Sequence, residues 1–543
     1  HRDSLLGIGM STQSEPAPGA QPVAATTPPA DAPRAVAVID IGTTAIRMAI
    51  GEIHGDGGIR TLETLSRPVA IGKDTFTHGA IARSTIEDCV RALSSYREVL
   101  DSYGIRNGSL RCVATSAVRE ASNRLAFVDR IYIATSIQVE ILDEAEISRV
   151  TFLGIQPTLR EEDLAATRTV VVEVGGGSTE VLVVHKSKVE FSHTYNLGSL
   201  RLRETLGTLR MPVRKQREIM ENQIDRFVQQ AVQSIDTSDD VPTEIVVQGG
   251  DCRFAAGQLA PNQVEHSLPT IEIESFEDFV DVMFRLPVDE IVHDYHLAYP
   301  DAETLAPALL TVLMFGRSLG TQNIRVSNVN LRDGLLQEMA NKGVWSEDFT
   351  EQVINSALDI GRHYAVDEKH ARHIAHLSGT LFDALKSQHR LDDRYRLMLK
   401  LAALLHEIGL FVGIASYHKH TMYLIQNSEL FGLSQRDLRL VAQVARYHRR
   451  ASPKPSHSGY ANLSREDRVI VSKLASILRI ADALDRSYSQ RIRDLECQVN
   501  RDRLILSVPG LDDLSLEQIA LKQSGGLFEE TYGISVLLRQ TRS

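Results

Sequence analysis

Apolar runs separated by glycine-rich turns dominate the first part of the chain and predict strands joined by tight turns. Residues 35–41 are apolar and residues 46–53 alternate between apolar and polar, with a Gly-Thr-Thr turn between them. Residues 84–87 read Ser-Thr-Ile-Glu, the form of a capping box, so we expect a helix from there to about residue 104. The same patterns predict strands at 110–114 and 139–142 and a helix at 144–154.

The opening strand-turn-strand pattern recurs once, with an offset of 133 residues from Gly42 to Gly175. Residues 169–174 are apolar, three glycines turn the chain, and residues 178–185 form a second apolar strand. In both copies an acidic residue, Asp40 or Glu173, stands two positions before the first glycine. We interpret the recurrence as an internal duplication of a supersecondary unit, because its period is too long for a solenoid repeat.

Changes of pattern further along predict the remaining organisation. Strands are expected at 241–247 and 323–330, a helix starts at residue 331, and helical periodicity runs from 347 to 488 with a Pro- and Gly-rich loop at 451–460. A strand at 504–508, a helix at 516–523 and a strand at 532–538 predict a small α+β region. The expected parts are a disordered Pro/Ala-rich tail (1–33), a first lobe (34–168), a second lobe (169–344), a helical domain (345–493) and a C-terminal cap (494–543).

Charge and cysteine content narrow the classes of partner and compartment. The 543 residues include 59 Lys and Arg against 70 Asp and Glu, a net charge of −11, so we expect no general affinity for nucleic acid or anionic membranes. No apolar run reaches the roughly 18 residues that a membrane helix needs. The 4 cysteines are widely spaced, which argues against a disulfide framework and favours the cytoplasm.

The two glycine turns are the strongest chemical signal in the sequence. Backbone amides at such a turn can approach an anion closely, and neighbouring hydroxyl groups add hydrogen-bond donors. The predicted phosphate-binding residues are Gly42, Thr43, Thr44, Gly175, Gly176, Gly177, Ser178 and Thr179. Two carboxylates that face one ligand can hold a magnesium ion, so Asp40 and Glu173 are the candidate ligands of Mg²⁺.

Several segments together resemble one family. Residues 40–44 (DIGTT) resemble the first phosphate loop of the actin, sugar-kinase and acetate-kinase superfamily. Residues 173–180 (EVGGGSTE) resemble its second loop, in the form typical of the exopolyphosphatase and guanosine pentaphosphate phosphohydrolase (Ppx/GppA) family. Residues 115–121 (TSAVREA), 197–202 (LGSLRL) and 331–335 (LRDGL) match further segments of that family in the same order. The resemblance covers roughly residues 34–500.

The resemblance implies an α/β fold with two actin-like (ribonuclease H-like, ASKHA) lobes, an all-α HD-like domain and a small α+β C-terminal cap. It implies a Mg²⁺-dependent hydrolase in which water releases the terminal phosphate of inorganic polyphosphate or guanosine pentaphosphate. Arg119 matches the arginine that clamps phosphate in the family, and Glu180 matches a residue that orients water or metal. Homodimers are common in the family.

The expected general base departs from the family pattern. The family has a catalytic Glu within a Glu-Glu-Ala-Arg run, whereas residues 144–149 read Glu-Ala-Glu-Ile-Ser-Arg and place Ile147 at that position. Isoleucine cannot accept a proton. Glu146 and Glu144 are therefore the candidate substitutes, although neighbouring residues on a helix point about 100° apart.

Two more departures concern positions after the second glycine turn. A small-residue turn of the family reads Gly249-Gly250-Asp251-Cys252, and an arginine of the family aligns near Asp301.

The helical domain carries its own set of metal-ligand side chains. His370, the adjacent pair His406-Glu407 and the distant Asp482 resemble the pattern of HD phosphohydrolases, with His-Glu in place of His-Asp. The resemblance implies a transition-metal site. The alternative is that these histidines are core residues at helix crossings.

Three functions follow as hypotheses: a phosphoanhydride hydrolase of exopolyphosphatase type, a polyphosphate or alarmone sensor that binds without turnover, and an HD-type metal phosphohydrolase. A kinase is disfavoured, because the GGGSTE form is not typical of kinases. Arg439, Arg446 and Arg450 are seven and four residues apart and can share one helical face, which is either a track for a long polyanion or a solvated surface.

Overall fold

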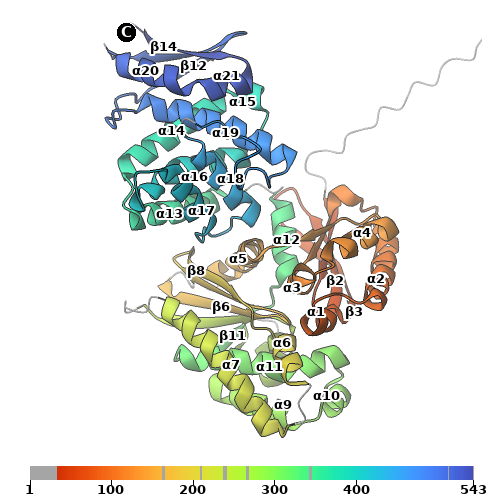
Figure 1. The fold of residues 1–543 in the computed structure, drawn as a ribbon. Coiled ribbons are helices and arrows are strands. Elements are labelled where there is room, and N and C mark those ends of the chain that lie inside the picture. The colour runs from red at the N-terminus through yellow and green to blue at the C-terminus, as the bar shows by residue number, and fades with distance from the viewer. Residues whose placement is uncertain are drawn as a thin grey trace, which may run out of the picture.

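The computed structural model describes residues 33–161, 166–207, 211–235, 241–263, 268–341, 345–449, 451–511 and 513–541. The predicted tail thus lies outside the described residues, apart from its last position. Two sheets with their helices form one end of the molecule, and a helical block with a small sheet forms the other (Figure 1).

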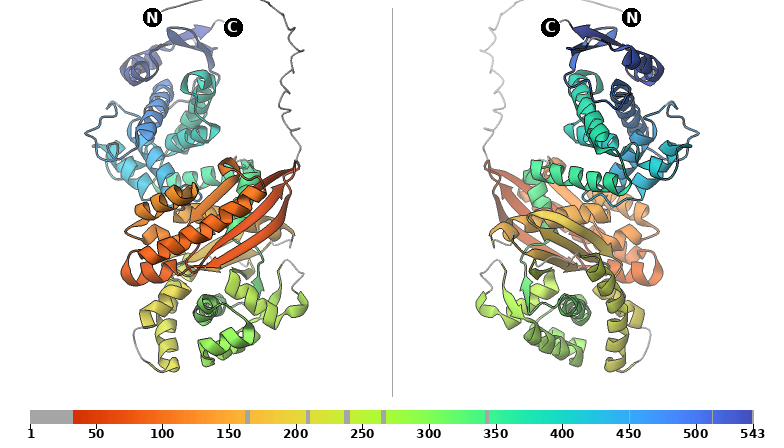
Figure 2. Two further views of the ribbon diagram at one scale, coloured as in Figure 1. Left: turned by 90° about the vertical axis from the view of Figure 1, so that its right-hand side faces the viewer. Right: turned by 90° about the vertical axis from the view of Figure 1, so that its left-hand side faces the viewer.

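The first sheet has the order β3-β2-β1-β4-β5. Its strands are β1 (Arg34–Ile41), β2 (Ala45–Ile53), β3 (Ile59–Pro68), β4 (Leu110–Ala114) and β5 (Val139–Ile141). Helices α2 (Arg83–Ser102) and α4 (Arg124–Thr135) cover one face, where Ile39, Leu93 and Phe127 are fully buried (Figure 2). Short helices α1 (Ile71–His78) and α3 (Ser116–Glu120) lie near the turn end of the strands.

The second sheet has the order β10-β11-β9-β6-β7-β8. Its strands are β6 (Arg168–Val174), β7 (Thr179–His185), β8 (Lys188–Tyr195), β9 (Thr243–Gln248), β10 (Thr270–Glu272) and β11 (Asn323–Val326). Its helices are α6 (Ser199–Gly207), α7 (Val213–Ser234), α8 (Gly250–Leu259), α9 (Ile273–Arg285), α10 (Val288–Tyr295) and α11 (Tyr299–Ser318). Along β6 the valines alternate between two cores: Val170 and Val172 pack with α7 and α11, while Val171 faces the opposite way.

The predicted duplication is confirmed by hydrogen bonding and register. Gly42 N donates to Ala45 O at 3.0 Å, and the matching Gly175 N donates to Ser178 O at 2.8 Å. In each sheet the hairpin lies beside a parallel strand, β4 next to β1 and β9 next to β6. The register also places Asp40 opposite Arg47 and Glu173 opposite Glu180. An acid therefore ends the first strand of both hairpins, just before the turn.

Two helices cross between the sheets and close the back of the first one. Helix α5 (Glu144–Glu161) and helix α12 (Leu331–Ala340) pack against each other and against the uncovered face of β1 and β2. They approach closely because Gly334 faces α5: a Cβ there would lie 2.1 Å from Val150 O. The segment before α12 comes from the second sheet, so this pair of helices ties the two sheets together.

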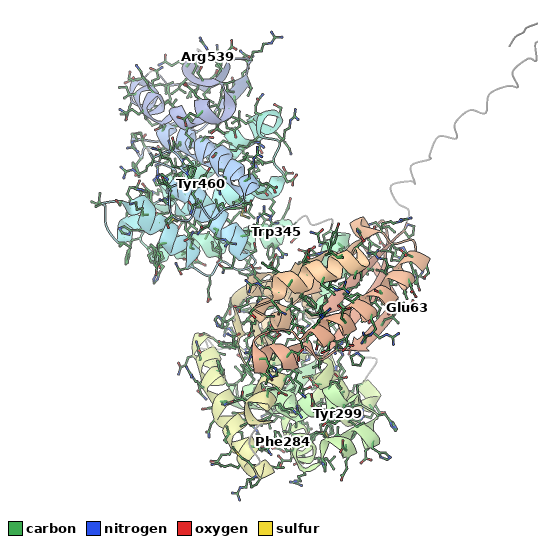
Figure 3. All side chains as sticks on the ribbon, turned by 45° about the vertical axis from the view of Figure 1, so that its right-hand side comes forward. Glu63, Phe284, Tyr299, Trp345, Tyr460 and Arg539 are labelled. Atoms are coloured by element: carbon green, nitrogen blue, oxygen red, sulfur yellow. The ribbon has the colours of Figure 1, made fainter. Side chains whose placement is uncertain are left out.

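The helical block contains α13 (Glu347–His363), α14 (Glu368–Ala384), α15 (Lys386–His389), α16 (Asp393–Leu405), α17 (Tyr417–Gln426), α18 (Gln435–Arg446) and α19 (Arg465–Leu484). Helix α19 packs on α20 (Ser515–Ser524) and α21 (Gly526–Tyr532), which accompany a sheet of β12 (Glu496–Val499), β13 (Arg503–Pro509) and β14 (Ser535–Thr541). Trp345 lies where this block meets the sheets (Figure 3), with the guanidinium groups of Arg149 and Arg394 over its ring.

Some local predictions were wrong. Helix α2 begins after Ala82 with no side-chain cap, so the Ser84 capping box does not form. Helix α5 continues beyond residue 154 to Glu161, through Pro157. Strands β3, β8, β10 and β12 were not anticipated, because their short or mixed patterns resemble loops. No helix of the described residues is both long and apolar enough to cross a membrane.

Candidate active site

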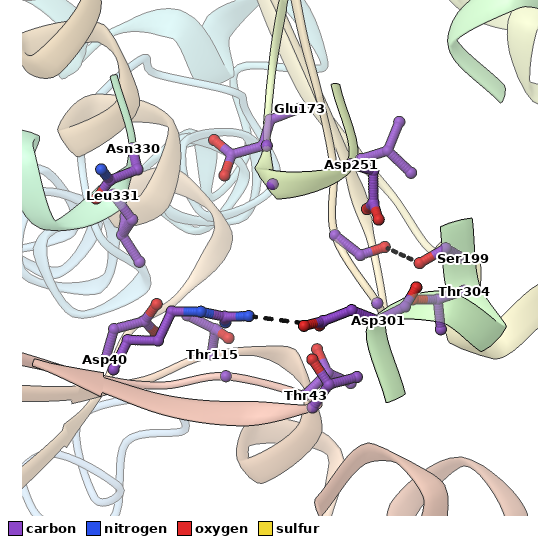
Figure 4. A pocket seen from close by; sticks show the side chains of 18 of the residues that line it. Asp40, Thr43, Thr115, Glu173, Ser199, Asp251, Asp301, Thr304, Asn330 and Leu331 are labelled. Atoms are coloured by element: carbon purple, nitrogen blue, oxygen red, sulfur yellow. Dashed lines mark hydrogen bonds and ion pairs between the residues drawn. The ribbon is translucent and has the colours of Figure 1, made fainter. Parts of the chain in front are cut away.

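A cavity of about 270 Å³ lies between the two hairpin turns and receives side chains from both sheets (Figure 4). In that view Asp40 and Thr43 extend from one ribbon, and Glu173 and Asp251 lie across the cavity from them. The predicted residues that line it are Asp40, Gly42, Thr43, Thr44, Glu173, Gly175, Gly176, Ser178 and Glu180. The duplication therefore brings the two predicted phosphate loops together on one cavity.

Three acidic residues of the cavity stand in an environment that disfavours their charge. Burial raises the pKa of Asp40, and nearby Arg332 and Arg47 only partly oppose this. Burial and the Glu180 carboxylate raise the pKa of Glu173. Burial also raises the pKa of Glu180, against the hydrogen bond that Ser178 Oγ donates to Glu180 Oε1 at 2.8 Å. These carboxylates repel one another in their charged forms, so a cation between them would stabilise those forms.

The residues present fit a divalent cation. Asp40 Oδ1 is buried and has no hydrogen-bond partner among the described residues, so it is an available oxygen ligand. The other Asp40 oxygen lies 3.5 Å from Arg332 Nη1. Oxygen donors of this kind suit a hard ion such as Mg²⁺. Asp40 and Glu173 are the side chains that would hold it.

The two loops touch each other at Thr43 and Gly176. A Cβ at Gly176 would lie 2.8 Å from both Cβ and Oγ1 of Thr43. The carbonyl of Gly176 accepts from the backbone amides of Leu200 and Arg201 at the start of α6, at 3.0 and 3.1 Å. Glycine is thus required at residue 176 for space, and the loop is held from behind by a helix N-terminus.

Arginines that the sequence analysis did not single out supply the positive charge of the cavity. Arg47, Arg253 and Arg332 line it, and Arg47 Nη2 lies 3.9 Å from Asp301 Oδ1. Asp251 also lines the cavity; burial first, and then Asp301, raise its pKa to about 7. The duplication gave a signal for Arg47, because it occupies the position that Glu180 has in the second copy.

Five predicted site residues do not line the cavity. Gly177 packs against Phe76 and Ser116, and the Thr179 hydroxyl donates to Leu197 O. Arg119 lies beside the cavity, where its Nη1 donates to Leu142 O at 2.9 Å. The charge of Arg119 opposes the rise that burial causes in the pKa of Glu180. The remaining two are the candidate bases Glu144 and Glu146.

The structure places neither candidate base in the cavity. Glu146 Oε2 accepts from the Asp143 backbone amide at 3.0 Å while Asp143 Oδ1 accepts from the Glu146 amide at 2.9 Å, so Glu146 caps helix α5. The Glu144 side chain is 52% exposed and lies 3.8 Å from Arg119. Ile147 does line the cavity. The helical turn that presents Ile147 directs its two acidic neighbours elsewhere.

The helical block brings its predicted set together as well. His370, His406 and Glu407 offer ligand atoms within 4.8 Å of one another, and Asp482 Oδ1 lies 3.6 Å from His406 Nε2. The face predicted for Arg439, Arg446 and Arg450 does not present all three arginines to solvent. Arg446 is buried and donates to Ser458 O, so it does not extend into solvent, and Arg450 lies outside the described residues.

Comparisons with known proteins agree with these features. The model of the Ppx/GppA phosphatase family matches residues 48–343, and the model of Ppx/GppA phosphatase domain III matches residues 354–525. A guanosine-5'-triphosphate,3'-diphosphate pyrophosphatase of Vibrio parahaemolyticus is 21% identical over 488 residues, covering 87% of this chain and 91% of the relative. One of Pseudoalteromonas translucida is 24% identical over 459 residues, covering 82% and 86%. The crystal structure of an exopolyphosphatase from Cytophaga hutchinsonii covers 57% of this chain and 99% of its own, with a TM-score of 0.52 and 22% identity, which shows a shared fold.

Proposed function

Because the chain belongs to the Ppx/GppA phosphatase family, whose members are phosphoanhydride hydrolases, we propose that it releases terminal phosphate from inorganic polyphosphate, guanosine pentaphosphate or both. The observation that carries the proposal is the meeting on one cavity of two duplicated glycine turns and five carboxylates, those of Asp40, Glu173, Glu180, Asp251 and Asp301. A phosphoryl group needs amide and hydroxyl donors around its oxygens and a cation against its charge. The cavity offers these donors from both hairpin turns, and carboxylates that could hold the cation.

The residues of the cavity divide the work between binding and proton transfer. The loops at Gly42 and at Gly175 and Gly176, with the hydroxyls of Thr43, Thr44 and Ser178, hold the terminal phosphate. Asp40 and Glu173 hold Mg²⁺, which when bound neutralises charge on the phosphate and polarises water. Glu180 accepts the proton of the attacking water, because it is the predicted catalytic carboxylate that lines the cavity. Arg119 supplements the positive charge beside Glu180.

Phosphate release from long-chain polyphosphate and from guanosine pentaphosphate, with Mg²⁺, tests the proposal. We expect Glu180→Gln to lower kcat at least about 100-fold, because a general base contributes about 10²–10⁴-fold. Glu146→Gln is the matched control, since this Glu caps α5 and leaves turnover within about threefold. No release from either substrate by the folded parent protein would reject hydrolysis. Equal loss in both variants would reject the assignment of Glu180.

Ile147 favours a second candidate function, binding with little or no turnover. It lines the cavity at the position where the family has its catalytic Glu, and it packs with Val150 and Leu331 in an apolar cluster. A polyphosphate or alarmone sensor would bind either polyanion with Mg²⁺ and release no phosphate. Equilibrium binding measured beside the release assay separates the two functions.

The proposal extends to the domains of the chain, its location and its oligomeric state. We propose the lobes at 34–168 and 169–344, an HD-like helical domain at 345–493 and a C-terminal cap at 494–543. The four cysteines are unpaired, which supports a cytoplasmic location. A homodimer is expected from the family, and size-exclusion chromatography with light scattering tests it.

A further inference from the structure

Four potential metal ligands from separate helices meet in the interior of the helical block, away from the phosphate cavity. His370 is on α14, His406 and Glu407 follow α16, and Asp482 is near the end of α19. The two histidine side chains are 1% and 0% exposed. Burying two imidazoles and two carboxylates together is costly unless something pairs them. Their arrangement therefore needs an explanation that the phosphate cavity does not supply.

Hydrogen bonds at the Nδ1 atoms decide which ring nitrogen of each histidine is free to bind a metal. His406 Nδ1 lies 2.7 Å from Ala403 O, and a carbonyl only accepts, so Nδ1 carries a proton. His370 Nδ1 lies 2.8 Å from Asp485 Oδ2, and that carboxylate also accepts from the Gln490 backbone amide at 2.7 Å through its other oxygen. The neutral form of each ring then has its lone pair on Nε2.

Both Nε2 atoms are buried and have no hydrogen-bond partner among the described residues. They face the same carboxylate: Asp482 Oδ1 lies 3.6 Å from His406 Nε2 and 3.9 Å from His370 Nε2. These separations are too long for hydrogen bonds. Two ligands that each lie about 2.0–2.2 Å from one ion are about 3.0–3.6 Å apart, so both separations are close to that of a ligand pair on a single metal.

The neighbours support a metal rather than a hydrogen-bonded network. Histidine ligands typically donate their other N–H to a carboxylate or a carbonyl, as His370 and His406 do here. His448 packs against His406, but its Nε2 pairs with the Tyr417 hydroxyl at 2.9 Å. The third nearby imidazole is thus occupied, while the other two remain available.

We propose that the helical block binds one divalent transition-metal ion through His370 Nε2, His406 Nε2 and Asp482 Oδ1, with Glu407 as a fourth ligand. Glu407 accepts a hydrogen bond from Tyr488, whose ring stacks on His370 and closes one side of the site. Two imidazole nitrogens with carboxylates favour ions of the zinc, manganese or iron class over Mg²⁺. The site is independent of the proposed hydrolysis at the phosphate cavity.

Metal binding by the full chain tests this inference directly. The protein is stripped with a chelator and titrated with Zn²⁺ or Co²⁺ by calorimetry, and the visible absorption of Co²⁺ reports nitrogen ligands. We expect one strong site in the parent. Asp482→Asn should weaken binding at least about 100-fold, and Asp485→Asn, which removes only the partner of His370, about 10–100-fold.

His389→Gln is the matched control. His389 is a buried histidine of the same block, but its Nε2 is 2.8 Å from Phe382 O and its Nδ1 accepts from the Leu391 amide at 2.9 Å. We expect this variant to bind metal like the parent. Circular dichroism confirms that each variant is folded. A folded parent that binds no metal, or an Asp482→Asn variant that binds as the parent does, would overturn the proposal. Failure of phosphate release leaves this readout unchanged.

Discussion

A methyl group added at Gly176 is expected to push the two phosphate loops apart. The new Cβ would lie 2.8 Å from Cβ and Oγ1 of Thr43 and 3.0 Å from its Cγ2. Neither loop can retreat freely. Thr43 O accepts from the Gly72 amide at 2.8 Å on one side, and Gly176 O accepts from the Leu200 amide at 3.0 Å on the other.

The size of the effect follows from these distances. Non-bonded carbon atoms prefer a separation of about 3.5–4.0 Å, so the loops must part by about 0.7–1.2 Å. Overpacking of this kind costs about 1–3 kcal/mol of unfolding free energy. A misplacement of about 1 Å at a reacting centre can lower the rate about 100-fold. We therefore expect Gly176→Ala to lower kcat/KM for phosphate release about 100-fold while the protein remains folded.

Steady-state phosphate release and urea unfolding of the parent and four variants check this reasoning. Gly257→Ala is the control, because a Cβ at this exposed helical position meets nothing within 4 Å. Thr43→Gly removes the atoms that clash, so Gly176→Ala should cost less than about threefold in that background, although Thr43→Gly is itself impaired. A Gly176→Ala variant with kcat/KM within threefold of the parent, or the same loss in both backgrounds, would refute the steric argument.

Three further predictions use the same structure. Arg119→Ala should weaken polyanion binding and lower kcat/KM about 10–100-fold, because a charged hydrogen-bonding group beside Glu180 is lost; unchanged binding and rate would reject its role. Asp251→Asn should stabilise the fold by about 1–3 kcal/mol at pH 8, as urea unfolding would measure. Since burial raises the pKa of Asp251 from 3.8 to about 7, the parent loses stability relative to the variant as the pH rises through that range, and a pH-independent difference would contradict the cause. Gly334→Ala should destabilise by about 3 kcal/mol or more, because its Cβ would strike the backbone at Val150; a melting temperature equal to that of the parent would count against close packing of α5 on α12.

Local patterns were enough to predict the parts of the site that repeat. The two turns, their acids and their hydroxyls were read from the sequence, and each sheet places them at the end of its first strand. The general base could not be predicted from local patterns. Glu146, Ile147 and Glu144 are neighbours on one helix, and only the packing of α5 decides that Ile147 faces the cavity while Glu146 caps the helix.

The sequence drew attention to other residues but did not show which residues they contact. Asp251 and Asp301 stood out as departures from the family, yet their meeting with Arg47 joins segments more than two hundred residues apart. Asp485 lay outside the predicted metal set, because nothing in its local sequence shows that it contacts His370.

Local pattern was sufficient for the strands of the two glycine-turn hairpins up to the turns themselves, because periodicity, turn chemistry and duplication are local properties of the chain. Tertiary structure alone decided which side chains share a cavity. The packing of α5 and α12 over the first sheet brings Ile147 to the cavity, and it depends on Gly334 meeting Val150 across the fold. The charge balance in the cavity also depends on the three-dimensional arrangement. Burial and neighbouring charges, rather than residue type, raise the pKa values of Asp40, Glu173 and Glu180.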